Sequence, residues 1–310
     1  MRLLSSRWVK AGISLGLLTL LVGVTDLGAL TRQVLTARVE IFLLAFVGYL
    51  AGQVLSVYRW QLLARPFGFA QPLRAFAVYY FVGMYLNLFA PSIVLGDLGR
   101  GLLLAEGRRD IGPAFSSVLA DRVSGVVMLL WVSAGGFLLF GPTVLPALLC
   151  YGTIAAAALT AIGWWALPHV VARCGSPRHK WRRVVEKIIV PYRARTLLLT
   201  HVCVLALAFH FFQLGLLMLL AYALGFAVPF WYLMLFTPLV TIVSVLPLSF
   251  SGIGVRESGY VVCLALIGVG RDQALALGLL WSAIVLGAGL VGGVVLLLSP
   301  EARLSLKRRQ

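Results

Sequence analysis

Long apolar runs dominate this chain and restrict it to a helical membrane fold. Three of them are Ala11–Gly23, Phe115–Phe140 and Ala274–Leu298. A helix needs about 20 mostly apolar residues to cross the hydrocarbon core of a bilayer, and several segments qualify. Hydrophobic residues make up 61% of the chain and charged residues only 12%, whereas a soluble domain carries about 25% charged residues. We therefore predict a single all-α polytopic membrane domain.

Six full membrane spans are predicted, together with two interrupted regions. The spans cover residues 11–30, 41–58, 115–140, 143–167, 197–222 and 273–298. The first is expected to be retained, because no small-residue cleavage site follows it. Regions 76–105 and 230–270 are interrupted by Pro91 and Pro247. The segment 258–270 would extend only about 20 Å as a helix, against a core of about 30 Å. Each region is therefore predicted to form two short helices, giving eight to ten helices in all.

Basic residues cluster at the ends of the apolar runs and predict the topology. Four clusters hold 18 of the 26 Lys and Arg residues, near the N-terminus, at 59–74, at 173–195 and near the C-terminus. Such clusters mark the cytoplasmic side, so both termini and the basic loop 168–196 are predicted to face the cytoplasm, in a cell inner (plasma) membrane. This distribution opposes a nucleic-acid groove. The stretch Arg178–Lys187 is expected to set topology or to touch anionic lipid headgroups.

Counting membrane crossings suggests how the interrupted regions are arranged. If 59–74 and 173–195 lie on one side, an even number of crossings separates them. The two predicted spans between them supply two crossings, so region 76–105 contributes none or two. The same count applies to region 230–270. Two re-entrant hairpins that enter from opposite faces satisfy this count, and so do two short full spans in each region.

The two interrupted regions share the pattern P-x4-G-x3-R. It runs from Pro91 to Arg100 and again from Pro247 to Arg256, 156 residues later and about half a chain length away. We interpret it as an internal repeat with halves 1–155 and 156–310. If the hairpins enter from opposite faces the repeat is inverted, which is an architecture of alternating-access transporters.

Ionisable residues lie inside the apolar regions, where each costs about 2.5–3.5 kcal/mol at a helix centre. They are Asp97, Arg100, Asp121, Arg122, Arg256 and Glu257. Neighbouring residues on a helix point about 100° apart, so Asp121 and Arg122 cannot fully neutralise each other. We expect partners on other elements, such as Arg100 for Asp121 and Asp97 for Arg122. One interpretation is that these pairs only fix the packing of helices.

A second interpretation, compatible with the first, is an anion site. Short helices that begin after Gly96 and Gly254 would present free backbone N–H groups, and guanidiniums contact phosphate oxygens in bidentate pairs. The predicted phosphate-binding residues are Arg100, Arg122, Arg256, Gly96, Gly252 and Gly254. The carboxylates of Asp97, Asp121 and Glu257 are predicted to orient the arginines, recognise a headgroup or couple transport to protons. A phosphate in an apolar cavity indicates a phospholipid or a polyprenyl-phosphate lipid.

The remaining polar residues of the apolar runs are predicted to be structural. Arg59 lies at the expected end of a span, from where its guanidinium would reach the interface. His201 and His210 are expected in the core or at a helix interface, and the four cysteines have no ligand spacing, so no metal or other cofactor is predicted. No GxSxG, Walker A or HExxH pattern occurs, and the longest polar stretch, 168–196, has fewer than 30 residues. We therefore predict that the chain is not an enzyme.

The order of these motifs resembles the flippase-like transmembrane family, also described as the lysylphosphatidylglycerol synthase transmembrane region. The resemblance covers nearly the whole chain and is carried by YRWQLL, LNLFAPSIVLGDLGRGLLLAEG, AFSSVLADRVSGVV and VLPLSFSGIGVRESGYVVCLALIGV. The family pattern falls on Pro91, Ser92, Gly96, Asp97, Arg100, Asp121, Arg122, Gly252, Gly254, Arg256 and Glu257. Leu95 replaces the first glycine of a pair and Ser251 precedes Gly252, which indicates slightly altered turns.

The resemblance implies movement of a phospholipid or a lipid-linked glycan between leaflets. It does not imply aminoacyl transfer, which belongs to a soluble domain of the synthases, so we expect a stand-alone member. Our leading hypothesis is a flippase-like lipid transporter without an ATPase domain. The alternatives are a membrane subunit that presents lipid to a glycosyltransferase or lipid synthase in envelope glycolipid synthesis, and a membrane-embedded enzyme.

Overall fold

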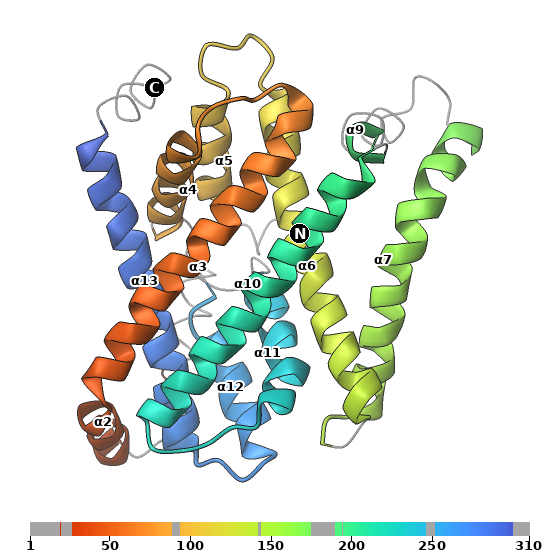
Figure 1. Ribbon diagram of the computed structural model, residues 1–310. Helices are drawn as coiled ribbons and strands as arrows, with labels where there is room; N and C mark the ends of the chain where they lie inside the picture. The colour runs from red at the N-terminus through yellow and green to blue at the C-terminus, as the bar shows by residue number, and fades with distance from the viewer. Residues whose placement is uncertain are drawn as a thin grey trace.

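The computed structural model describes residue 19 and residues 27–88, 94–141, 144–174, 190–193, 195–245 and 252–299. Within these ranges every regular element is helical (Figure 1). The elements are α2 (Leu27–Thr36), α3 (Val39–Ala64), the 3₁₀ helix η2 (Arg65–Phe67), α4 (Leu73–Leu88), α5 (Val94–Leu104), α6 (Gly112–Phe140), α7 (Ala147–Cys174), α9 (Val190–Arg193), α10 (Thr196–Ala223), α11 (Phe230–Val245), α12 (Val255–Ala265) and α13 (Arg271–Leu298). The predicted fold class, an all-α polytopic membrane protein, is confirmed.

Five of the described helices are long and apolar enough to cross a membrane, namely α3, α6, α7, α10 and α13. They correspond to five of the six predicted spans, while most of the first predicted span lies outside the described residues. Large apolar side chains cover their outer faces, as with Leu138 and Leu148, which is 84% exposed. Such faces suit contact with lipid chains. The largest difference is at α7, which runs from Ala147 to Cys174 instead of from 143 to 167. Helix α3 also continues past its predicted end, to Ala64, because Leu62 and Leu63 extend the apolar run.

The two interrupted regions form two pairs of short helices. Helices α4 and α11 have 16 residues each, and α5 and α12 have 11 each. At 1.5 Å per residue these are about 24 Å and about 16 Å long, too short to cross a core of about 30 Å. In Figure 1, α4 and α5 occupy the upper half of the molecule and α11 and α12 the lower half. Over the described residues these lengths agree with two re-entrant hairpins that enter from opposite faces, which stays a prediction for the complete regions.

The opposed hairpins and their equal helix lengths agree with an inverted repeat, although the half-repeat boundaries at 155 and 156 stay a prediction. The shared motif does not have the same register in the two copies. Arg100 is the seventh residue of α5, whereas Arg256 is the second residue of α12. The two arginines therefore occupy different turns of their helices.

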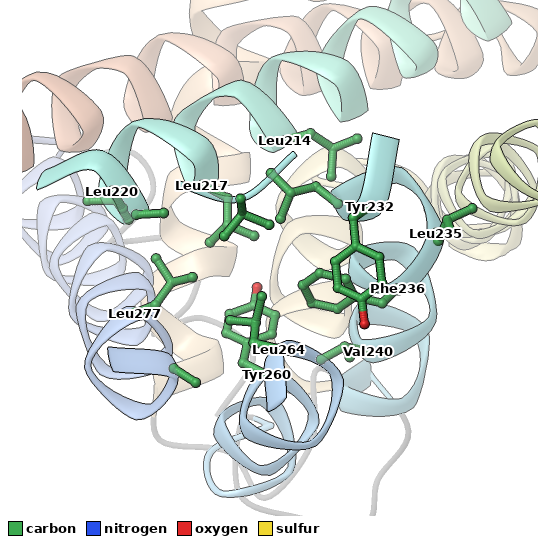
Figure 2. Close-up of a cluster of buried hydrophobic side chains, with 14 of the residues drawn as sticks. Leu214, Leu217, Leu220, Tyr232, Leu235, Phe236, Val240, Tyr260, Leu264 and Leu277 are labelled. Carbon is green, nitrogen blue, oxygen red and sulfur yellow. The ribbon is translucent and has the colours of Figure 1, made fainter. Parts of the chain in front are cut away.

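Two apolar clusters attach the hairpins to the long helices. The first joins α4 and α5 to α3 and α6 through residues such as Trp60, Phe76 and Leu104. The second, shown in Figure 2, holds α11 and α12 against α10 and α13. Its labelled members are Leu214, Leu217, Leu220, Tyr232, Leu235, Phe236, Val240, Tyr260, Leu264 and Leu277. Both hairpins are thus packed against the long helices on one side, while residues such as Leu98 and Val262 stay exposed on the other.

Helix α13 approaches α4 so closely that only glycine fits at the contact. A Cβ atom added at Gly292 would overlap the backbone carbonyl of Phe81. We expect Gly292→Ala to destabilise the protein by about 1–3 kcal/mol, as overpacked interiors do. The matched control is Gly152→Ala on α7, where nothing lies within 4 Å of the added atom. Thermal unfolding in detergent should show a lowered midpoint for Gly292→Ala only, and equal midpoints would contradict the close contact.

Candidate functional site

The two hairpins bring two helix N-termini toward the middle of the molecule. Helices α5 and α12 each begin near the centre and run outward in opposite directions (Figure 1), and a helix N-terminus carries partial positive charge. Gly252 and Gly254 precede α12 at φ angles of 78° and 85°, which glycine adopts without strain. The Gly254 amide donates to Glu257 Oε2 at 2.6 Å, and the Gly96 amide donates to Asn87 Oδ1 at 2.8 Å. Helix α5 includes Gly96, so the prediction that this helix begins after Gly96 is wrong, and neither glycine amide is free. Phosphate binding by these glycines stays a prediction.

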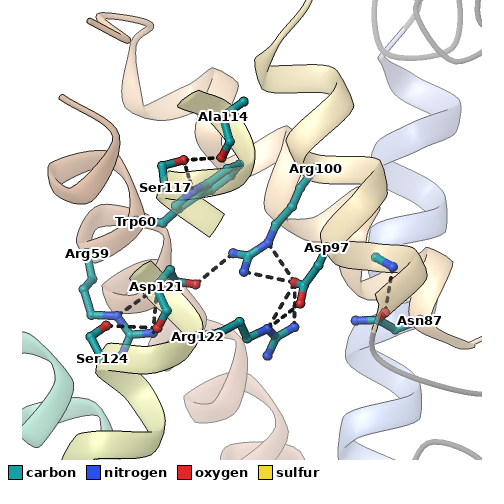
Figure 3. A network of polar contacts seen from close by, with 11 residues as sticks. Arg59, Trp60, Asn87, Asp97, Arg100, Ala114, Ser117, Asp121, Arg122 and Ser124 are labelled. Carbon is teal, nitrogen blue, oxygen red and sulfur yellow. Dashed lines mark hydrogen bonds and ion pairs between the residues drawn. The ribbon is translucent and has the colours of Figure 1, made fainter. Parts of the chain in front are cut away.

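Five charged side chains form one continuous chain of ion pairs across α3, α5 and α6 (Figure 3). Arg59 Nη2 lies 2.7 Å from Asp121 Oδ1, and Arg100 Nη1 lies 2.9 Å from Asp121 Oδ2. Arg100 Nε donates to Asp97 Oδ1 at 3.1 Å. Arg122 closes the chain with Nε 2.8 Å from Asp97 Oδ2. The predicted pairs of Asp121 with Arg100 and of Arg122 with Asp97 are both confirmed.

The predicted interfacial position of Arg59 is wrong. Its side chain points inward and is almost fully buried, at 6% exposure, with two nitrogens on Asp121. The physical reason is that Asp121 has two oxygens to satisfy in a low-dielectric setting, and Arg100 reaches only one of them. The apolar residues that follow Arg59 are the sequence signal for this burial, because they place it before the end of the span.

Arg100 is the central residue of this ion-pair network and contacts side chains on three other helices. It is only 2% exposed, and its guanidinium lies 4.8 Å from the Trp60 ring and 5.2 Å from the Tyr80 ring. Trp60 Nε1 in turn donates to Ser117 Oγ at 3.2 Å. Cation–π contacts of this kind add to ion pairing when the site is desolvated. Arg100 therefore ties α5 to α3, α4 and α6, as the packing interpretation expects.

A cavity of about 200 Å³ lies beside these ion pairs, between the two hairpin tips. Five of the nine predicted site residues line it: Gly96, Asp97, Arg100, Arg122 and Arg256. The other four support the site from behind or lie in the turn before α12: Asp121, Gly252, Gly254 and Glu257. Sequence reasoning missed several polar lining residues: Tyr49, Gln53, Tyr80, Asn87 and Ser282. No spacing marks them, because they come from α3, α4 and α13 and meet only in the folded protein.

Arg256 differs from the arginines of the first hairpin. Among the described residues, no carboxylate lies within ion-pair distance of it. Its Nη1 donates instead to Ser282 Oγ at 2.9 Å, and Ser282 Oγ donates to Glu257 Oε1. In the first hairpin, Arg100 contacts the carboxylate of Asp121 on α6. In the second hairpin, Arg256 contacts the neutral hydroxyl of Ser282 on α13. Arg256 is half-buried and lines the cavity, so it presents a cation there without a direct counterion.

The described histidines do not line the cavity. His210 is buried with Nε2 3.1 Å from the carbonyl oxygen of Gly125, as expected for a core histidine. The same prediction is wrong for His201, which is exposed on α10. Across the described ranges, no group of three His, Cys, Asp or Glu side chains is placed to hold a metal ion.

The fold and the cavity define a class of protein, a polytopic helical membrane protein with a charged site between two opposed re-entrant hairpins. The chain belongs to the family described as lysylphosphatidylglycerol synthase TM region, whose sequence model matches residues 7–293. This match confirms the family expected from the motifs. Comparisons with curated proteins and with solved structures gave no match.

Proposed function

We propose that this protein is a flippase-like transporter that moves a phosphate-bearing lipid between the leaflets of the inner membrane, and that it is not an enzyme. The observation that carries the proposal is the position of Arg256, a cation without a direct counterion that lines a cavity between two half-membrane hairpins. An unpaired charge costs several kcal/mol in a low-dielectric site, so an anionic ligand that neutralises it is strongly favoured. Membership of a membrane family whose description names a lipid synthase agrees with a lipid ligand.

In this account the headgroup occupies the cavity while the acyl chains stay among the apolar helix faces. Arg256 contacts the phosphate from the second hairpin. Arg122 contacts it from α6, since its side chain is 38% exposed although it also holds Asp97. Arg100 is paired with two carboxylates and positions the first hairpin. The two hairpins belong to opposite halves of the chain, so movement of one against the other would open the cavity to each leaflet in turn.

The carboxylates of the site serve to orient arginines and helix ends. Asp97 and Asp121 each contact two guanidiniums. Glu257 accepts hydrogen bonds from the Gly254 amide and from Ser282. This arrangement favours an orienting role over direct recognition of a headgroup, and coupling to the proton gradient would need one of these bonds to break.

The test is lipid movement by the purified protein in liposomes that carry a trace of fluorescent phospholipid. We expect rapid exchange between leaflets with the wild-type protein and background exchange with the double variant Arg100→Ala, Arg256→Ala. Unchanged movement in a folded double variant would remove the proposed mechanism. Background exchange with the wild-type protein, together with co-purification of a glycosyltransferase or lipid synthase, would instead favour a membrane subunit that presents lipid to that enzyme.

The proposed orientation places both chain termini in the cytoplasm. The membrane end that holds the start of α10 and the end of α13 carries Arg65, Arg74, Arg108, Arg109 and Arg195 among its described residues. The opposite end carries Arg32, Arg38 and Arg271, and the richer end is expected inside. In a cysteine-free background, an impermeant maleimide should label Arg271→Cys in intact cells and Arg109→Cys only after permeabilisation. The reverse pattern would contradict the orientation.

A further inference from the structure

We propose that the site selects lipids whose headgroup carries one net negative charge, with a small, hydroxylated and otherwise uncharged group beyond a phosphodiester. This inference rests on the proposed function and specifies the substrate class of the same site. It follows from the balance of charge, from the engagement of every carboxylate and from the size of the cavity.

The charges of the site leave an excess of one positive charge. Four guanidiniums are present, those of Arg59, Arg100, Arg122 and Arg256, against three carboxylates, those of Asp97, Asp121 and Glu257. With all seven groups ionised, one anionic charge makes the site neutral. A phosphodiester carries that single charge. A zwitterionic or cationic headgroup brings an additional positive charge, which the low-dielectric site disfavours.

Every carboxylate of the site is already paired with an arginine or hydrogen-bonded. Both oxygens of Asp97 contact Arg122, and one of them also contacts Arg100. Asp121 is shared between two buried arginines. Glu257 is fully buried and accepts two hydrogen bonds. An ammonium group in the cavity would therefore meet Arg122 and Arg256 and would have to compete with Arg122 for the carboxylate of Asp97, while both arginines would repel it.

The cavity also limits the size and the chemistry of the headgroup. Its volume of about 200 Å³ is below the range of about 300–1,000 Å³ of pockets that enclose drug-sized ligands. A glycerol-sized headgroup fits this space, whereas an oligosaccharide is larger than it and would extend beyond it. Tyr49, Gln53 and Tyr80 line the cavity, and hydroxyl and amide groups can both donate to and accept from headgroup hydroxyls. Met84, Val285 and Leu286 form an apolar side of the cavity.

The experiment compares fluorescent lipids, each at trace level in the same proteoliposomes. Three of the probes share their acyl chains and differ only in headgroup, namely phosphatidylglycerol, phosphatidylethanolamine and lysylphosphatidylglycerol. The fourth probe is a polyprenyl-linked oligosaccharide. We expect phosphatidylglycerol to move at least about tenfold faster than the other three. Equal rates for all probes, or faster movement of the amine-bearing or glycan-bearing lipids, would overturn the selectivity and leave the proposed function standing. Background rates for every probe would overturn the proposed function itself.

A change of charge at Arg256 gives a second readout. Arg256→Gln removes the excess positive charge, and we expect the preference for phosphatidylglycerol over phosphatidylethanolamine to fall to less than about twofold. Arg256→Lys keeps the positive charge and is expected to retain the preference. Ser282→Asn keeps a neutral hydrogen-bonding group beside Arg256 and is also expected to retain it. An unchanged preference in the charge-altered variant would contradict the charge argument.

Discussion

Replacing Arg256 by glutamine is expected to lower the rate of phospholipid movement at least about tenfold while the protein stays folded. A hydrogen bond to a charged group contributes about 1.5–3 kcal/mol, which corresponds to a factor of about 10–150. The fold should survive because no carboxylate pairs with Arg256 among the described residues, so its removal leaves no anion behind. Glutamine also keeps a donor for Ser282 Oγ. The measurement is the initial rate of leaflet exchange in proteoliposomes at matched protein content.

Two further variants separate the charge from the general effect of substitution. Arg256→Lys keeps the positive charge without the guanidinium geometry, and we expect it to retain part of the activity. Arg109→Gln removes an exposed arginine at the membrane surface and should leave the rate unchanged. Wild-type exchange rates for Arg256→Gln would show that this arginine does not bind the phosphate.

Replacing Asp121 by asparagine is expected to destabilise the fold by about 3–5 kcal/mol. Asp121 lies between Arg59 and Arg100, and all three side chains are buried. Removing one partner of a buried ion pair leaves an uncompensated charge, and this accounts for the large cost. We expect a much lower unfolding midpoint in detergent and a smaller monodisperse fraction on size exclusion.

The matched control is Glu106→Gln, which makes the same change from carboxylate to amide at an exposed position and should cost less than about 0.5 kcal/mol. Arg100 keeps its pair with Asp97 in this variant, whereas Arg59 loses its carboxylate partner. Adding Arg59→Gln to Asp121→Asn removes that unpaired cation and should restore part of the lost stability. An Asp121→Asn protein as stable as the Glu106→Gln protein would contradict the central position of Asp121 in the network.

Much of the fold could be predicted because a bilayer leaves few options. Apolar run length sets the spans, and segments such as 258–270 were recognised as too short to cross. The partners of Asp121 and Arg122 could also be predicted. Charges buried in an apolar domain tend to pair, and the apolar regions contain few other ionisable residues.

The rest depended on packing that sequence spacing does not record. A charged residue near the end of an apolar run predicts the end of a span, and on that basis Arg59 is expected at the interface. The helix instead continues past Arg59 to Ala64. The repeat motif suggested equivalent arginines, yet the different register puts Arg100 among carboxylates and Arg256 beside Ser282. A serine in a membrane helix gives no sequence signal of this kind, so the excess charge at Arg256 emerged only from the folded arrangement.

The central claim is that Arg256 holds a lipid phosphate in the cavity between the hairpins. Native mass spectrometry of the protein, purified in mild detergent without added lipid, tests it directly. We predict that the wild-type chain retains one anionic phospholipid and that Arg256→Gln, prepared identically and equally folded, loses it. Equal lipid occupancy in the two proteins would contradict the claim.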